Sequence, residues 1–241
     1  MNKTFEQTIY HKWTNSFGRS TETAYQTGTT IVPESKYEDK KIIVLEYIGR
    51  HTFAQIDPFY FQTLNQLIQT LSPETSMNGA HIQTVWDEKT IQSHDHGVTY
   101  YLHPSDLPTH LPSESFSVRK LELGDAERMS GLHQACTAEE VDEGYVEVTH
   151  QIAFGCFHHG ELVAASSGYE RTGFLDIGVL THPNFRKKGL GRAVVGALCA
   201  WAIEKHIIPQ YRHDAHNINS QRVAESLNFK QYFKTEAFTF R

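Results

Sequence analysis

The chain has 241 residues, of which 39% are hydrophobic and 12% aromatic, and its formal net charge is −6. This length is long for one minimal domain and short for two full ones, and the apolar fraction is sufficient for a packed core. The acidic balance argues against nucleic acid as the main partner and suits a cationic amine. The three cysteines are widely spaced, which indicates neither a disulfide framework nor a cysteine-based zinc site.

The hydropathy pattern shows neither a membrane span nor a secretion signal. No apolar run approaches the length of a membrane-crossing helix, and the first residues lack the apolar core of a signal peptide. We therefore expect a cytoplasmic protein without a membrane partner. The oligomeric state is left open between monomer and homodimer.

The N-terminal part predicts a small α/β domain of unknown function over residues 1–103. An apolar stripe at helical spacing opens the chain, a β-rich run follows over 41–48, and residues 52–56 alternate as a strand does. Pro58 introduces a helix with one apolar face. Residues 99–102 indicate a further strand.

A proline-rich linker is predicted over residues 104–114, which hold three of the eight prolines. Beyond it, residues 115–241 predict a second α/β domain. Its first elements are a strand at 117–121 and a helix that Asp125 caps. A hairpin then turns across residues 158–160, and a short apolar strand follows over 174–180.

A glycine-rich and basic loop after this strand is the most informative feature of the sequence. Arg186-Lys187-Lys188-Gly189-Leu190-Gly191 leads directly into an apolar helix-forming stretch. Glycine lets the backbone approach a ligand, and the first-turn N–H groups of a helix carry the positive end of its dipole. The basic side chains add positive charge. We expect a polyphosphate site here, with a spacing unlike that of a P-loop or a dinucleotide fingerprint.

A second segment, residues 217–229, supports the first. Asn217 is followed three residues later by Ser220, and the segment ends in Leu-Asn-Phe. Asn228 stands at a predicted helix C′ position, where asparagine tolerates the left-handed conformation. Asn217 is equally well explained as a helix N-cap.

The strand, the proline turn, the Arg-x-x-Gly-x-Gly loop and this second segment together resemble the acetyl-coenzyme A (acetyl-CoA) signature of the GNAT superfamily of N-acetyltransferases. The resemblance covers residues 115–241. Within the superfamily, the chain is similar to the members with an N-terminal extension, of the antibiotic self-resistance type. It implies an α/β (α+β) GNAT fold, with a mixed central sheet flanked by helices. The smaller N-terminal domain is open to interpretation as a partial GNAT-like copy.

The resemblance also implies an activity. The protein would move an acetyl group from acetyl-CoA, as cosubstrate, to a primary amine of a small molecule. The amine would attack the thioester directly in a ternary complex, without a metal. Two alternatives stay open: a non-catalytic or regulatory module that binds CoA, and an acyltransferase that uses a longer acyl-CoA.

The resemblance assigns cofactor binding to three segments, namely the end of the strand, the loop and the second segment. Main-chain groups of Val179, Leu180 and Thr181 would pair with the pantetheine arm, and an N–H near Leu180 would stabilise the oxyanion. The remaining predicted cofactor residues are Arg186, Lys187, Lys188, Gly189, Leu190, Gly191, Arg192, Ala193, Asn217 and Ser220.

The resemblance assigns catalytic roles to three residues. Asp176 would accept the proton of the ammonium through water, and an exposed strand-end aspartate is the alternative interpretation. Many members carry a Tyr in the second helix as proton donor to the thiolate, but Ala224 holds that position here. Tyr232 and Ser220 are the candidate donors, and Tyr232 is also explained as a packed aromatic.

The fifteen histidines include three short clusters that look like metal ligands, namely His94-Asp95-His96, His158-His159 and His213-Asp214-Ala215-His216. None has the helical i, i+4 pair with a carboxylate that marks a zinc signature. We therefore predict no metal site.

Overall fold

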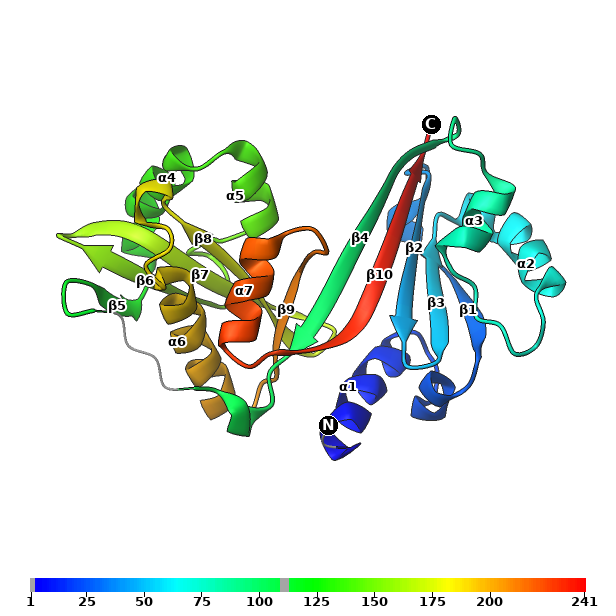
Figure 1. Ribbon diagram of the computed structural model, residues 1–241, viewed down its shortest axis with the longest axis horizontal. Coiled ribbons are helices and arrows are strands. Elements are labelled where there is room, and N and C mark those ends of the chain that lie inside the picture. The colour runs from blue at the N-terminus through cyan, green and yellow to red at the C-terminus, as the bar shows by residue number, and fades with distance from the viewer. Residues whose placement is uncertain (1–2, 109–112) are drawn as a thin grey trace. The chain divides into compact units, whose positions relative to one another are not determined.

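The computed structural model describes residues 3–108 and 113–241 (Figure 1). The chain forms two compact units, and neither is continuous in sequence. The first unit comprises Met1–Thr99, Asp214–His216 and Tyr232–Arg241, and the second comprises Tyr100–His213 and Asn217–Gln231. Residues 109–112 of the predicted linker lie outside the described residues.

The first unit contains a mixed sheet in the strand order β1-β3-β2-β10-β4. β1 pairs parallel with β3, whereas β2 pairs antiparallel with β3 and with β10. The elements are α1 (Lys3–Ser16), η1 (Thr21–Tyr25), β1 (Gly28–Pro33), η2 (Ser35–Tyr37), β2 (Ile42–Ile48), β3 (His51–Ile56), η3 (Pro58–Tyr60), α2 (Phe61–Thr70), α3 (Gly79–Val85), β4 (Ile91–Tyr101) and β10 (Lys230–Phe240).

Both faces of this sheet are covered, which explains why β2 and β3 are buried on both sides. On one face Trp13 of α1 packs edge-on against Phe233 of β10, and Phe17 stacks on Phe53. The other face packs against α2 and α3, and each large buried side chain there contributes about 2 kcal/mol. The core on that side consists of Ile43, Leu45, Ala54, Ile56, Tyr60, Leu64, Met77, Ile82, Phe238 and Phe240.

The second unit contains a mixed sheet in the strand order β9-β8-β7-β6-β5. Its pairs are antiparallel except β8 with β9, which is parallel. The elements are η4 (Pro104–Asp106), β5 (Ser117–Lys120), η5 (Leu123–Asp125), α4 (Ala126–Ala135), α5 (Ala138–Gly144), β6 (Ile152–His158), β7 (Glu161–Arg171), β8 (Phe174–Thr181), η6 (Pro183–Phe185), α6 (Leu190–Glu204), β9 (Pro209–Asp214) and α7 (Ile218–Ser226).

Helices cover both faces of this second sheet. Met129 and Leu132 of α4 pack with Leu180 of β8 on one face. Leu190 and Val194 of α6 pack with residues of β6 and β7 on the other. The predicted fold class, a mixed sheet flanked by helices with a smaller N-terminal α/β part, is confirmed.

The C-terminal strand β10 belongs to the first unit, whereas the sequence suggested that it belongs to the predicted domain over residues 115–241. β10 pairs antiparallel with β2, from Lys234 opposite Tyr47 to Thr239 opposite Ile42. A strand's partner is selected by long-range packing, which local sequence does not encode. The predicted functional boundaries, 1–103, 104–114 and 115–241, therefore stay a prediction, and the compact units follow a different division.

Candidate active site

β8 and β9 pair over only the first part of β8. The parallel register joins Leu175 to Pro209, Asp176 to Gln210 and Ile177 to Tyr211, whereas β8 continues to Thr181. On its other edge β8 stays paired with β7 over its full length. In the described pairing, the end of β8 thus has no partner on the β9 side. An extended ligand can add to such an edge through main-chain hydrogen bonds.

The loop after β8 enters α6 through two residues with positive φ. Lys187 has φ 62° and Gly189 has φ 74°, and Gly189 is the N-cap of α6 with no side-chain capping bond. Glycine adopts this conformation without steric cost. The first-turn N–H groups of a helix have no intrahelical acceptor, so the start of α6 favours an anion.

Gly191 and Arg192, at the start of α6, fit a bound diphosphate. A Cβ at Gly191 would lie 3.3 Å from Thr181 Oγ1 and 3.6 Å from Val179 Cγ2, so the glycine keeps the helix start close to β8. Arg192 Nε is buried and has no hydrogen-bond partner among the described residues. A buried donor without an acceptor costs about 1–3 kcal/mol, and a phosphate oxygen would remove that cost.

The basic side chains of the loop differ in their surroundings. Arg186 forms an ion pair with Glu140 of α5 at 2.8 Å, and its Nε donates to the Thr181 carbonyl at 3.2 Å. Arg186 therefore connects α5 to the loop. Lys188 lies over the Phe185 ring, 4.9 Å from its centroid. Leu190 and Ala193 are buried, so only their main-chain groups are suited to contact a ligand.

Asn217 is the N-cap of α7, the alternative that its sequence position left open. Its Oδ1 accepts from Ser220 N at 3.0 Å, and its Nδ2 donates to Glu143 at the end of α5 at 3.1 Å. Asn228 has φ 63°, which confirms the predicted left-handed conformation.

Ser220 is hydrogen-bonded to a buried tyrosine of β9. Burial raises the pKa of Tyr211 to about 12, against the opposing effect of the Ser220 hydrogen bond. Ala224, two turns of helix nearer the end of α7 than Asn217, is fully buried. The Ser220–Tyr211 pair is therefore a hydroxyl pair on α7 and β9, next to the strand end where β8 and β9 separate.

Asp176 is buried, and its carboxylate binds several donors. Arg212 donates to both oxygens, with its shortest contact 2.6 Å to Oδ2. Gln210 donates to Oδ1 at 3.1 Å and the Tyr169 hydroxyl to Oδ2 at 3.0 Å. Asp176 is thus not an exposed strand-end aspartate. These contacts occupy the carboxylate lone pairs and favour an anchoring role.

Three ring-bearing residues beside Asp176 were missed by the sequence analysis. His150 lies 4.8 Å from the Tyr145 ring and 5.1 Å from the Tyr169 ring, and its Nδ1 is 2.8 Å from Ser167 Oγ. Burial lowers the pKa of His150, opposed by the nearby Glu147 carboxylate. These residues stand alone in the sequence, with no motif that groups them.

Tyr232 belongs to the first unit. Its ring meets Phe5 of α1 edge-on, with centroids 6.2 Å apart. This packing is the alternative that the sequence analysis gave for it, and its role as proton donor stays a prediction. Among the described residues, no helix has the length and apolar character needed to cross a membrane.

A family model and several solved structures are similar to parts of this chain. Residues 146–238 match the family model described as GNAT acetyltransferase, and this match extends from β6 into β10. No curated protein matches the chain.

Two solved structures share the fold. One is an acetyltransferase from the GNAT family of Colwellia psychrerythraea, 15% identical with a TM-score of 0.52, covering 78% of this chain and 76% of that one. The other is a GCN5-related N-acetyltransferase from Sphaerobacter thermophilus, 10% identical with a TM-score of 0.55, covering 78% and 71%. These structures show the fold, and residues 146–238, from β6 into β10, are similar to the GNAT acetyltransferase family.

Proposed function

We propose that this protein is an N-acetyltransferase that transfers the acetyl group of acetyl-CoA to a primary amine of a small molecule in a ternary complex. The observation that carries the proposal is the separation of β8 from β9 after Ile177, followed at once by the glycine loop and the start of α6. One continuous segment thereby offers an unpaired strand edge for an amide-containing arm and an anion site for a diphosphate.

The binding step follows from these two features. Val179, Leu180 and Thr181 pair through their main chain with the pantetheine amides, as a missing strand would. The diphosphate lies at the N-terminus of α6, where Gly189 and Gly191 allow close approach. Arg192 Nε donates to it, and the exposed Lys187 and Lys188 add positive charge. Arg186 supports the loop through Glu140.

The chemical step needs two proton transfers. The neutral amine nitrogen attacks the thioester carbonyl carbon, a C–N bond forms, and the C–S bond breaks with its electron pair on sulfur. The amine loses one proton, and the thiolate gains one. An N–H near Leu180 stabilises the intermediate oxyanion, an effect that is typically worth about 3 kcal/mol.

For the proton acceptor, we propose that Asp176 anchors the site and His150 accepts the proton. Asp176 has little freedom to do so because Arg212, Gln210 and Tyr169 already bind it. His150 is held neutral near pH 7 by the burial that lowers its pKa, and a neutral imidazole accepts protons at that pH. Asp176 acting through water is the alternative assignment.

For the proton donor to the thiolate, we propose the Ser220–Tyr211 pair. Ala224 is buried and offers no hydroxyl, so the usual donor of the family is missing. Ser220 lies at the start of α7 and is hydrogen-bonded to Tyr211, which supplies a hydroxyl from each of two elements. Tyr232 is the other candidate donor.

The missing hydroxyl at Ala224 also favours a second candidate function, a module that binds CoA without transferring the acyl group. A longer acyl-CoA as cosubstrate is a variant of the main proposal. The substrate class that we propose is a small aminated natural product of the antibiotic type, modified in the cytoplasm by a monomer or homodimer. Neither nucleic acid nor a membrane is part of the proposal.

An acyl-transfer assay tests the proposal. The protein is mixed with acetyl-, succinyl- or a longer acyl-CoA and a panel of primary amines, and free thiol is measured with a chromogenic disulfide. We expect thiol release that depends on one amine class and is fastest with acetyl-CoA. His150→Gln is expected to lower kcat about 100-fold with acetyl-CoA affinity unchanged. Bound acetyl-CoA that stays intact with every amine would instead establish the non-catalytic module.

A further inference from the structure

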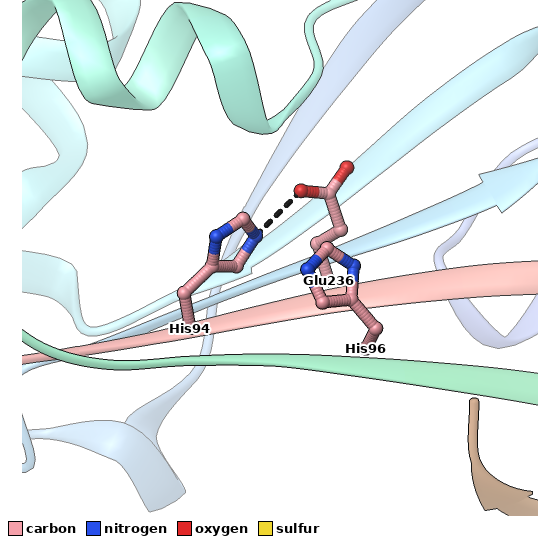
Figure 2. Close-up of side chains that lie close together, drawn as sticks. All are labelled: His94, His96 and Glu236. Carbon is pink, nitrogen blue, oxygen red and sulfur yellow. Dashed lines mark hydrogen bonds and ion pairs between the residues drawn. The ribbon is translucent and has the colours of Figure 1, made fainter. Parts of the chain in front are cut away.

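Three side chains of the first unit form a cluster that the acyl-transfer chemistry does not use. His94 and His96 are two residues apart on β4, so both point to the same face of the sheet. Glu236 reaches the same place from the neighbouring strand β10 (Figure 2). One nitrogen of each imidazole and one carboxylate oxygen all lie within 4.8 Å of one another, and all three residues are partly buried.

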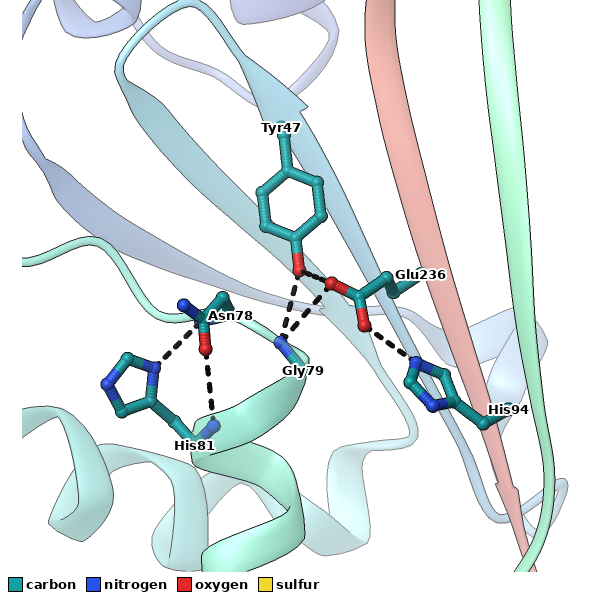
Figure 3. A network of polar contacts seen from close by, with 6 residues as sticks. All are labelled: Tyr47, Asn78, Gly79, His81, His94 and Glu236. Carbon is teal, nitrogen blue, oxygen red and sulfur yellow. Dashed lines mark hydrogen bonds and ion pairs between the residues drawn. The ribbon is translucent and has the colours of Figure 1, made fainter. Parts of the chain in front are cut away.

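The orientation of the Glu236 carboxylate is set by groups outside the cluster (Figure 3). Its Oε1 accepts from the Tyr47 hydroxyl and from the Gly79 N–H at 3.4 Å. Its Oε2 is thereby left facing His94, whose Nε2 lies 2.6 Å away. Metal-binding carboxylates are typically held in this way by a hydrogen bond to the oxygen that does not bind the metal.

The start of α3 is shaped around this carboxylate. A Cβ at Gly79 would overlap with Glu236 Oε2, so only glycine leaves room for the carboxylate at its present position. Gly79 has no positive φ, which means that backbone conformation does not explain the glycine there. The requirement comes from the carboxylate.

The imidazole of His94 is also held in place. Its ring stacks on Phe238 of β10 with centroids 4.0 Å apart and planes at 19°. The His96 ring is 4.3 Å from it. Because Phe238 is fully buried in the core, His94 has little rotational freedom to lose on binding a ligand.

We propose that His94, His96 and Glu236 bind a divalent transition-metal ion, with zinc the best fit to the donor set. Two imidazole nitrogens and one carboxylate oxygen are the protein ligands of a three-ligand zinc site, and a fourth position is left for water or a ligand. Bonds of about 2.0–2.1 Å place tetrahedral ligand atoms about 3.3 Å apart. The ion would replace the His94–Glu236 hydrogen bond, whose 2.6 Å separation is shorter than this spacing.

The site would cross-link β4 and β10, two strands from distant parts of the sequence. His94 and Glu236 are 142 residues apart, so the ligands come together only in the folded chain. A metal that binds only the folded state stabilises it by mass action. The expected effect of saturating zinc is a rise of about 5 °C in the Tm of the first unit.

Calorimetry on the full chain, after dialysis against a chelator, tests the proposal with zinc chloride as the probe. We expect one zinc ion per chain with a Kd at or below about 1 μM. Glu236→Gln and His96→Gln are each expected to weaken binding about 100-fold or more, and Tyr47→Phe about 10-fold. The matched control is His159→Gln, which removes an imidazole from the β6–β7 turn and should leave the zinc affinity unchanged.

A further variant tests the site without removing any of the three metal-binding side chains. Gly79→Ala retains all three ligands but displaces the carboxylate, so it should weaken zinc binding about 10-fold while circular dichroism shows the chain folded. The proposal is overturned if zinc does not bind at about 100 μM protein. It is also overturned if Glu236→Gln and His96→Gln bind zinc as the wild-type chain does, or if His159→Gln weakens binding as much as they do.

Discussion

The loop at the start of α6 and the His94–His96–Glu236 cluster are two polar sites built in opposite ways. The loop is one continuous stretch, and its glycines, its charges and the helix that follows are all visible in order along the chain. The cluster joins two strands whose residues are 142 positions apart. A site formed by one continuous stretch of chain can be predicted from the sequence. A site formed by the pairing of two distant strands cannot.

The largest expected effect is a loss of stability when the packing of α5 on β8 in the second unit is disturbed. Gly178 lies on β8, and a Cβ there would overlap with the backbone carbonyl of Gly144 at the end of α5. Gly178→Val should therefore destabilise the protein by about 3 kcal/mol or more, because a backbone atom cannot yield as a side chain can. Urea denaturation measures the loss.

The control for Gly178→Val is Gly131→Ala in α4, where a Cβ would meet nothing within 4 Å. Alanine has the higher helix propensity, so this variant should gain up to about 1 kcal/mol. Equal denaturation midpoints for the wild type and Gly178→Val would show that α5 does not pack on β8 as described.

An intermediate effect concerns the local site. In Gly191→Val the new side chain meets Thr181 and Val179 and moves the start of α6 away from β8. We expect acetyl-CoA affinity to fall about 10-fold or more, equivalent to about 1.4 kcal/mol, with a smaller change in stability. Calorimetric titration measures the affinity. Gly196→Ala, later in α6, is the control and should bind as the wild type does.

The smallest expected effect concerns a charge pair in the second unit. Asp125 stands at the N-cap of α4, as predicted, but its side chain makes no capping bond to that helix. It binds Arg119 at 2.8 Å. The Arg119 hydrogen bonds lower the pKa of Asp125 from 3.8 to about 2, against the opposing effect of burial. Stability from the ionised form is therefore present above pH 4 and is lost between about pH 4 and 2.

The predicted size of this effect is small because Arg119 is half exposed and solvent screens the pair. We expect Asp125→Asn to cost about 1 kcal/mol at pH 7 and the difference from the wild type to disappear near pH 2. Denaturation at several pH values measures it. A difference that stays constant from pH 7 to pH 2 would mean that the ion pair does not stabilise the folded state.

The sequence predicted the elements of the second unit well because each has a local signal. The hairpin turn at His159 and the glycines before α6 are both determined by neighbouring residues. The strand partner of β10 was not predictable, since β2 selects it through the core around Ile43 and Phe238.

The candidate sites divide in the same way. The cofactor loop followed from its motif, but the contacts of Asp176 with Arg212 depend on β8 and β9 lying side by side. Along the chain, the His94–Asp95–His96 stretch lacks the helical i, i+4 histidine pair with a carboxylate, so no metal site was predicted there. The carboxylate of Glu236 comes from another strand, and no local pattern points to it.

The most direct measurement of the central claim is a calorimetric titration of the full chain with CoA and, separately, with pantetheine, which lacks the diphosphate. If the start of α6 binds the diphosphate, CoA should bind with a Kd in the micromolar range and pantetheine at least about 100-fold more weakly, a difference of about 2.7 kcal/mol. Equal affinities for the two compounds, or no binding of CoA, would contradict the account.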